Sequence, residues 1–187
     1  LASFPEALSA KARRQLEKLG VEVSTGVPVT AIDAGGYRLG DHYVPARTVV
    51  WAAGVAASPL ARSLGVPLDR AGRVPVERDL SVAGHPRVFV AGDLATIKRE
   101  DGSPVPGVAP AAKQMGRHVA STIRARLRGE PAPAFRYRDF GNLATIGRMA
   151  AVVDLHGFRF SGLPAWWFWL AAHVFFLIGF RNRLVVL

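Results

Sequence analysis

The sequence contains no cysteine, and this absence removes several kinds of chemistry at once. Without thiols there are no disulfides, no thiolate metal ligands and no cysteine-based redox centre. The histidines are scattered, with no close pair of the kind that binds a metal: His42, His85, His118, His156 and His173. We therefore expect no metal site, and we interpret the histidines as structural or surface residues.

A second absence is the glycine motif G-x-G-x-x-G, which marks the phosphate loop of a dinucleotide-binding domain and occurs nowhere in the chain. No recognisable zinc, helix-turn-helix or RNA-binding motif accompanies the net charge of +10. Residues 1–95 hold 11 Lys+Arg against 9 Asp+Glu, whereas residues 96–187 hold 13 against 5. Because this basic half ends in an apolar, tryptophan-rich segment, it favours an anionic membrane surface over nucleic acid as its partner.

Half of the 187 residues are hydrophobic, enough for a sizeable core in one or two domains. Residues 88–90 form a short apolar run that predicts a buried parallel strand, and Gly92 and Asp93 follow it. Ligands of open α/β sheets bind beyond the carboxyl ends of such strands, where a carboxylate accepts hydrogen bonds from sugar-like hydroxyls. The alternative is that Gly92 and Asp93 merely open a turn.

Two neighbouring segments favour the ligand interpretation. Residues 48–54 predict a second buried strand that runs into Ala53 and Gly54. Residues 109–128 predict a helix with Pro110 in its first turn, and its apolar positions are Ala112, Met115, Val119, Ile123 and Leu127. The start of this helix offers unpaired N–H groups and positive potential to a ligand that gains negative charge.

These residues, with the Ala112-x-Gln114-x-Gly116 segment and the tryptophan-rich tail, resemble type II NADH:quinone oxidoreductase, a flavoprotein of the respiratory chain. The resemblance implies an α/β fold: the C-terminal part of a two-dinucleotide-binding-domain, Rossmann-like flavoprotein, then a small antiparallel β unit and an apolar membrane-binding helix. It implies that residues 1–50 end the NADH-binding domain, 51–130 form the second half of the FAD-binding domain and 131–187 form a membrane-binding domain.

The resemblance also implies the cofactor FAD, the substrate NADH and a membrane quinone. It assigns FAD contacts to Ala53, Gly54, Gly92, Asp93, Ala109, Pro110 and Ala111, and quinone contacts to Pro110 and Gln114. Pro110 stands where the family pattern A-Q-x-A-x-Q-x-G has its first glutamine, which removes one polar quinone contact. No catalytic acid or base is expected, because the cofactor carries out hydride transfer. The missing cysteines disfavour the similar sulfide:quinone oxidoreductases.

The remaining pattern indicates an amphipathic helix over residues 6–19 ended by Gly20, a short strand at 21–23 and an antiparallel meander within 27–50. A second antiparallel unit is predicted between residues 135 and 160, with turns at 147–148 and 156–157.

The tail contains 21 residues, 160–180, without a formal charge. As a helix it would reach roughly 30 Å, a length that permits spanning. Tryptophans at one end and a histidine near the middle favour an interfacial helix instead. Membrane contact is expected from Trp166, Trp167, Phe168, Trp169, Arg181 and Arg183. A helix buried in protein is the alternative.

From these features we expect the C-terminal portion of a longer enzyme, beginning after both glycine motifs and bound peripherally to the cytoplasmic face of the inner membrane. Its partners would be the bilayer surface, a membrane quinone and the preceding portion of the same protein, and a homodimer is left open. The competing class is a non-catalytic basic membrane adaptor, in which Asp93 and Gln114 bind no ligand.

Overall fold

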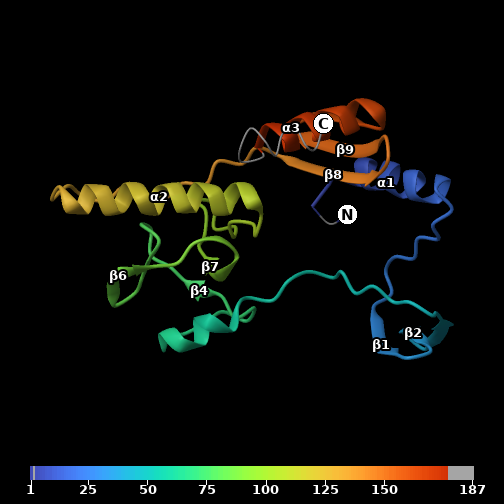
Figure 1. Ribbon diagram of the computed structural model, residues 1–187, viewed down its shortest axis with the longest axis horizontal. Helices are drawn as coiled ribbons and strands as arrows, with labels where there is room; N and C mark the ends of the chain where they lie inside the picture. The colour runs from blue at the N-terminus through green and yellow to red at the C-terminus, as the bar shows by residue number, and fades with distance from the viewer. Residues whose placement is uncertain (2, 177–187) are drawn as a thin grey trace. The chain divides into compact units, whose positions relative to one another are not determined.

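The computed structural model describes residue 1 and residues 3–176, and these fall into two compact units (Figure 1). The first unit comprises Leu1–Trp51 together with the chain from Phe140 onward, and the second comprises Ala52–Asp139. Each unit is described by itself.

The centre of the first unit is a three-stranded antiparallel sheet in the order β10-β9-β8. Its strands are β8 (Asn142–Gly147), β9 (Ala150–Leu155) and β10 (Phe158–Ser161). Met149 and His156 take left-handed backbone conformations, with φ of 59° and 53°, in the two turns that connect these strands. The C-terminal antiparallel unit predicted from the sequence is confirmed.

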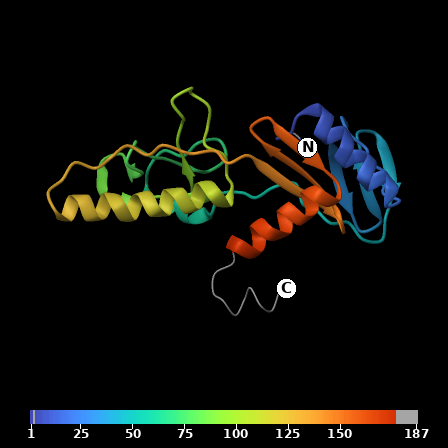
Figure 2. The ribbon, with the colours of Figure 1, turned by 90° about the horizontal axis from the view of Figure 1, so that it is seen from above.

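Helices cover both faces of this sheet: α1 (Glu6–Lys18) lies on one and α3 (Leu163–Phe176) on the other (Figure 2). Successive residues of a strand point to opposite faces. Accordingly, Val152 packs with Leu8 and Ala12 of α1, whereas its neighbours Ala151 and Val153 pack with Ala165 of α3. The result is a helix–sheet–helix sandwich with β9 at its centre.

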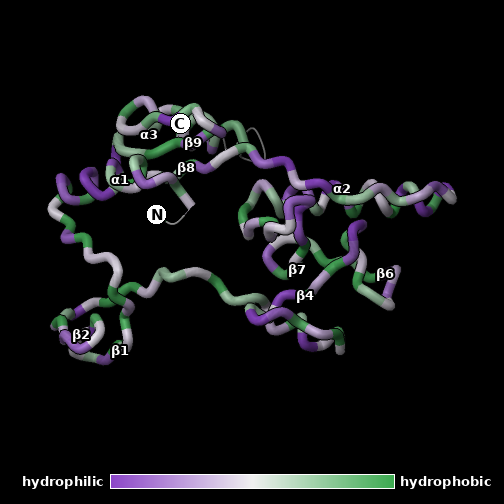
Figure 3. The backbone as a smooth tube through the Cα atoms, turned by 180° about the vertical axis from the view of Figure 1, so that it is seen from behind, coloured by the Kyte–Doolittle hydropathy of each residue, from purple (hydrophilic) through white to green (hydrophobic). Residues whose placement is uncertain are grey.

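Helix α1 forms where it was predicted and stops before Gly20, whose φ of 82° is the left-handed conformation that glycine favours. Figure 3 shows hydrophilic residues, in purple, recurring along this helix. The short strand predicted at residues 21–23 is wrong, because no described strand pairs with this segment.

The predicted meander is also present, as β1 (Val29–Asp33), β2 (Gly36–Leu39) and β3 (His42–Pro45) in one antiparallel sheet. The Asp33 carboxylate fixes the first turn by accepting hydrogen bonds from the N–H groups of Gly35 and Gly36, at 2.8 and 3.0 Å. The Gly35 N–H and then the Tyr43 hydroxyl lower the pKa of Asp33, because they stabilise the charged carboxylate.

The second unit is built from short elements around one long helix. These are η1 (Pro59–Leu64), β4 (Val74–Pro75), β5 (Ser81–Val82), β6 (His85–Phe89), η2 (Gly92–Leu94), β7 (Ala95–Thr96) and α2 (Ala109–Leu127). The core of this unit contains Val74, Leu80, Val82 and Met115, each at most 3% exposed.

The predicted buried parallel strand at residues 88–90 is wrong. β6 pairs antiparallel with β5, and Val88 is 37% exposed, while Val90, which follows the strand, is buried. Gly84, with φ of 74°, lies between the two strands, so the partner of β6 is its neighbour in sequence. The parallel pairing in this unit is instead between β4 and β7, which align Val74 with Ala95.

The predicted strand at residues 48–54 is likewise wrong. Val50 and Trp51 are 83% and 63% exposed, and none of the described strands supplies a hydrogen-bonding partner for this segment. Helix α2 forms as predicted, but its buried side is shifted: Ile123 and Leu127 are exposed, whereas Thr122 and Ala125 are buried.

Candidate functional site

A pocket in the second unit gathers residues from three separate stretches of sequence. It lies where η2, the loop before α2 and the first turns of α2 meet, and Arg73, directly before β4, and Ala95 of β7 complete it. Its lining residues are Arg73, Gly92, Asp93, Ala95, Val105, Pro106, Gly107, Ala111, Ala112 and Met115. Gly92, Asp93 and Ala111, three of the predicted FAD contacts, are therefore neighbours in space.

Gly92 holds the chain close to α2 at one side of this pocket. Its φ of 75° is a conformation that other residues rarely adopt, and a Cβ there would lie 3.4 Å from Cβ of Ala112. The Gly92 N–H donates a hydrogen bond to Met115 Sδ at 3.2 Å. The turn therefore favours glycine through its backbone conformation, whereas a Cβ here would meet Ala112 only in ordinary van der Waals contact.

Asp93 follows with an exposed side chain that makes no hydrogen bond or ion pair within the part of the chain that the structure describes. A Cβ on Gly107 would lie 3.5 Å from Asp93 Oδ1, which places the carboxylate beside the loop that leads into α2. Both oxygens of this carboxylate are available as hydrogen-bond acceptors.

The first turn of α2 presents its backbone to the same pocket. Val108 is the N-cap residue, and no side chain caps this end of the helix. The turn contains no acidic residue, and Pro110 carries no N–H. Ala111 is buried, whereas Ala109 and Pro110 are exposed. The positive end of the helix dipole therefore lies next to the pocket, and none of the described carboxylates caps it.

Arg73 is a pocket residue that the sequence patterns did not single out. Arg73 lies directly before Val74 of β4, and Asp93 lies two residues before Ala95 of β7. Because β4 and β7 pair in parallel, with Val74 opposite Ala95, both charged residues lie at the same end of this strand pair. Arg73 Nε binds Asp69 Oδ2 at 2.8 Å. Burial opposes ionisation of Asp69, but hydrogen bonds from the Arg73 N–H and guanidinium outweigh it and lower the pKa of Asp69. A lone arginine before a two-residue strand leaves no signal in the sequence.

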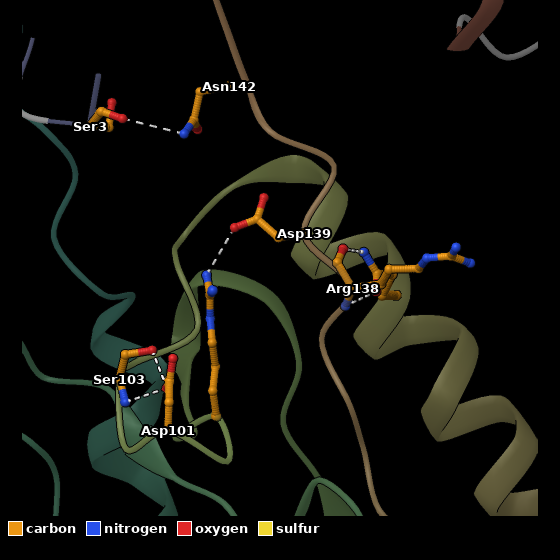
Figure 4. A network of polar contacts seen from close by, with 8 residues as sticks. Ser3, Asp101, Ser103, Arg138, Asp139 and Asn142 are labelled. Atoms are coloured by element: carbon orange, nitrogen blue, oxygen red, sulfur yellow. Dashed lines mark hydrogen bonds and ion pairs between the residues drawn. The ribbon is translucent and has the colours of Figure 1, made fainter. Parts of the chain in front are cut away.

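Gln114, the predicted quinone contact, is bound to protein backbone. Its Nε2 donates to the Arg138 carbonyl and its Oε1 accepts from the Arg138 N–H, both at 2.9 Å. Figure 4 shows Arg138 joined to α2 by these two bonds. Gln114 therefore fixes the segment that follows α2 onto the helix. One amide hydrogen and one oxygen lone pair remain for a further partner.

Other contacts hold the same segment, residues 135–139. Phe135 packs edge-on against His118, one turn beyond Gln114, with ring centroids 5.4 Å apart. Tyr137 lies under the Arg99 guanidinium at 4.9 Å, and Arg99 binds Asp139 at 3.3 Å (Figure 4). These residues form a strap across α2, and we use this name for residues 135–139 below.

Two of the predicted FAD contacts lie apart from the pocket lining. Ala53 and Gly54 are exposed, and a Cβ on Gly54 would meet no atom within 4 Å. Their assignment as cofactor contacts therefore stays a prediction.

The predicted membrane residues lie on α3 with unequal exposure. Trp167 and Phe168 are 57% and 40% exposed, whereas Trp166 packs against the core on this face of the sheet. Trp169 stacks on His173 with ring centroids 4.0 Å apart. Arg181, Arg183 and the end of the predicted helix lie outside the described residues.

Among the helices that the structure describes, none combines the length and apolarity needed to cross a bilayer. Within the same residues, no group of three or more histidine, cysteine, aspartate or glutamate side chains is arranged to hold a metal ion.

Comparisons with known proteins place these features in context. The family model described as pyridine nucleotide-disulphide oxidoreductase matches residues 1–116, and the model of the NDH2 C-terminal domain matches residues 140–187. Two relatives from Mycobacterium tuberculosis are type II NADH:quinone oxidoreductases: Ndh is 44% identical over 192 residues, and NdhA is 42% identical over 194 residues. Both alignments cover 96% of this chain.

The chain spans about 40% of the length of these relatives. A solved structure, NDH2 from Plasmodium falciparum in complex with NADH, matches all of this chain and 54% of its own chain, with a TM-score of 0.87. The sequence identity in that match is 16%, so it supports a shared fold.

Proposed function

Because the chain belongs to the pyridine nucleotide-disulphide oxidoreductase family, we propose that it forms the flavin-, quinone- and membrane-contacting part of a type II NADH:quinone oxidoreductase. The observation that carries this proposal is the pocket in which Gly92, Asp93 and the uncapped start of α2 converge. In the complete protein, electrons would pass from NADH to FAD and from FAD to a membrane quinone.

The residues of the pocket fit a flavin. Asp93 offers a carboxylate without a partner among the described residues, and Gly92 and Gly107 bring backbone close to it without side chains in the way. The start of α2 adds the Ala109 N–H and positive potential, whereas the Ala111 N–H already donates to the Val108 carbonyl. Together these supply hydrogen-bond acceptors for a polyhydroxyl chain and a favourable field for a ring that gains negative charge.

When bound, FAD supplies the hydride acceptance and electron delivery. The residues of this chain would position it and set its electrostatic surroundings. Asp93 would accept hydrogen bonds from the ribityl hydroxyls, and Ala109, Pro110 and Ala111 would line the ring at the positive end of α2. Ala53 and Gly54 would add backbone contacts once the rest of the flavin domain is present.

On the quinone side, Gln114 lies one turn further along α2 and retains one amide hydrogen beyond its bond to Arg138. That hydrogen would meet a quinone carbonyl beside Pro110. The exposed Trp167 and Phe168 would insert into the cytoplasmic leaflet of the membrane, with Trp166 and Trp169 fixing the helix from which they project. Insertion of these side chains would keep the enzyme peripheral.

The decisive experiment replaces Asp93 by alanine in the complete protein and measures bound FAD after purification. A carboxylate that accepts hydrogen bonds from ribityl hydroxyls contributes about 1.5–3 kcal/mol per hydrogen bond, so FAD affinity should fall at least about tenfold. Asp101→Ala is the matched control, because Asp101 is an exposed carboxylate of the same unit whose hydrogen bonds, within the described part of the chain, come from Ser103. Retention of FAD by Asp93→Ala would reduce Asp93 to a turn residue and would overturn the proposal.

A further inference from the structure

Helix α1 carries three cations on one flank: Lys11, Arg14 and Lys18. Their spacing of three and four residues places them side by side along the helix. None of the three pairs with a carboxylate within the described residues. Arg13, on the other flank, is by contrast engaged: its Nε binds Glu17 at 2.8 Å, and its guanidinium donates to the Val23 carbonyl at 3.2 Å.

The three cations line a surface groove together with Gln15 and Ser161. Ser161 is the last residue of β10 and pairs with Val152, so it lies on the face of the sheet that α1 covers. β10 is an edge strand of the sheet, and α3 begins at Leu163, directly after the turn at Gly162. The groove therefore opens at the edge of the sheet where the chain passes from the α1 face to the aromatic helix.

Gln15, which lines this groove, has a buried polar atom. Its Oε1 has no hydrogen-bond partner among the residues that the structure describes. Because Oε1 is the buried side of this amide, the NH2 group is the side left to donate to a ligand. Two ammonium groups, one guanidinium, a hydroxyl and a carboxamide then offer donors from several directions. This donor set suits the oxygens of a phosphate group.

We propose that this groove binds the phosphate headgroup of an anionic phospholipid, an inference that rests on the membrane association put forward above. A lipid is favoured over a soluble phosphate because the same unit exposes apolar aromatic side chains, Phe158 and Trp167, at 70% and 57%. Phe158 belongs to β10 itself, and its ring lies 5.5 Å from Phe160, which in turn lies 5.7 Å from Phe168 of α3. The edge of the sheet thus joins a phosphate-binding groove to an aromatic surface.

The test is sedimentation of the complete protein with lipid vesicles. One set contains phosphatidylcholine alone, and in the other a third of the lipid is phosphatidylglycerol. A cation near an anionic surface raises partitioning about fivefold, so Lys11→Gln/Arg14→Gln/Lys18→Gln should bind phosphatidylglycerol vesicles about a hundredfold more weakly. Its binding to phosphatidylcholine vesicles and its NADH oxidation with a soluble acceptor should match those of the unaltered protein.

The control Arg47→Gln/Arg62→Gln/Arg87→Gln removes the same charge from exposed positions outside the groove. An equal loss in this control would overturn the proposal, because net charge would then explain the effect. Displacement of the protein from vesicles by millimolar glycerol phosphate would also overturn it, because the site would then take a soluble phosphate.

Different results would overturn membrane attachment, which is the premise, and headgroup binding by the groove, which is the inference. Equal binding of the unaltered protein to both kinds of vesicle overturns the groove and leaves membrane attachment intact. Failure to bind either kind overturns membrane attachment itself. Trp167→Ala should weaken binding to both kinds alike, because apolar insertion does not depend on lipid charge.

Discussion

Different kinds of contact stabilise each of the two units of the chain internally. In the first, apolar side chains of β9 are sealed between two helices, and Ala151, Val152 and Val153 are each 0% exposed. In the second, a core that includes Val74, Leu80 and Met115 is supplemented by charged and amide hydrogen bonds that fasten the short strands and loops, such as those of Asp79, Arg73 and Gln114. The difference teaches that a ligand pocket made of short strands and loops needs polar contacts in addition to packing, whereas a sheet between two helices is ordered mainly by packing.

This comparison is tested most strongly at Val152, which packs against Leu8 and Ala12 of α1. Val152→Ala should destabilise the sandwich by about 2 kcal/mol, because it removes buried methyl groups and leaves a cavity. Hydrogen exchange of the β9 amides should then accelerate about thirtyfold. Ile32→Ala, at a 46% exposed position of the same unit, is the control. A smaller effect at Val152 than at Asp79 would refute the distinction between the units.

The second prediction concerns Asp79, which accepts hydrogen bonds from the Ser81 hydroxyl and N–H, at 2.6 and 3.1 Å, and pairs with Arg126. Asp79→Ala should cost about 1.5 kcal/mol at pH 7, because these donors lose a charged acceptor. Exchange of the β5 and β6 amides should rise accordingly. Asp101→Ala, in an exposed turn of the same unit, should have a smaller effect.

The same site predicts a pH dependence. Burial opposes ionisation of Asp79, but hydrogen bonds from Ser81 and then Arg126 outweigh it and lower the pKa of Asp79 below its usual value. Its stabilising effect is therefore complete above about pH 4, the pKa of an unfolded aspartate, and is lost as the pH falls through the lower folded value. The stability difference between the unaltered protein and Asp79→Ala should shrink on acidification. A difference that grows would contradict this assignment.

The smallest expected change in stability is at Gln114. Gln114→Ala should cost about 1 kcal/mol and should speed exchange in the strap, because both hydrogen bonds to Arg138 are lost. If the amide also meets the quinone, the KM for quinone should rise while flavin reduction by NADH stays near normal.

Gln114→Glu separates the two roles of this side chain. A glutamate still accepts from the Arg138 N–H but cannot donate to the Arg138 carbonyl or to a quinone. It should therefore retain part of the strap protection and lose the quinone contact. Equal losses of both half-reactions in the two variants would place Gln114 in the fold alone.

The sequence predicted those parts of the fold whose partners are close along the chain. The meander at residues 29–45 and the sheet at 142–161 are antiparallel hairpins, and their turns contain Gly35, Gly40 and Gly157. Both long helices were predicted with nearly correct limits, because apolar spacing and a following glycine mark them.

The wrong predictions share a cause. The runs at 48–54 and 88–90 look like buried strands, but a parallel strand is buried by partners distant in sequence, and composition does not reveal those partners. Gly92, Asp93 and Ala111 do meet in one pocket, whereas Arg73 was missed. The bond from Gln114 to the strap was also missed, because its partner is backbone and leaves no mark on residue identity.

The alternation along β9 limits how this part of the protein can change in length. Val152 belongs to the α1 face and Val153 to the α3 face, so a one-residue insertion or deletion within the strand would exchange every inward contact between the two helices. Length variation should therefore be confined to the turns at Arg148–Met149 and His156–Gly157, where a loop can grow without shifting the strand register.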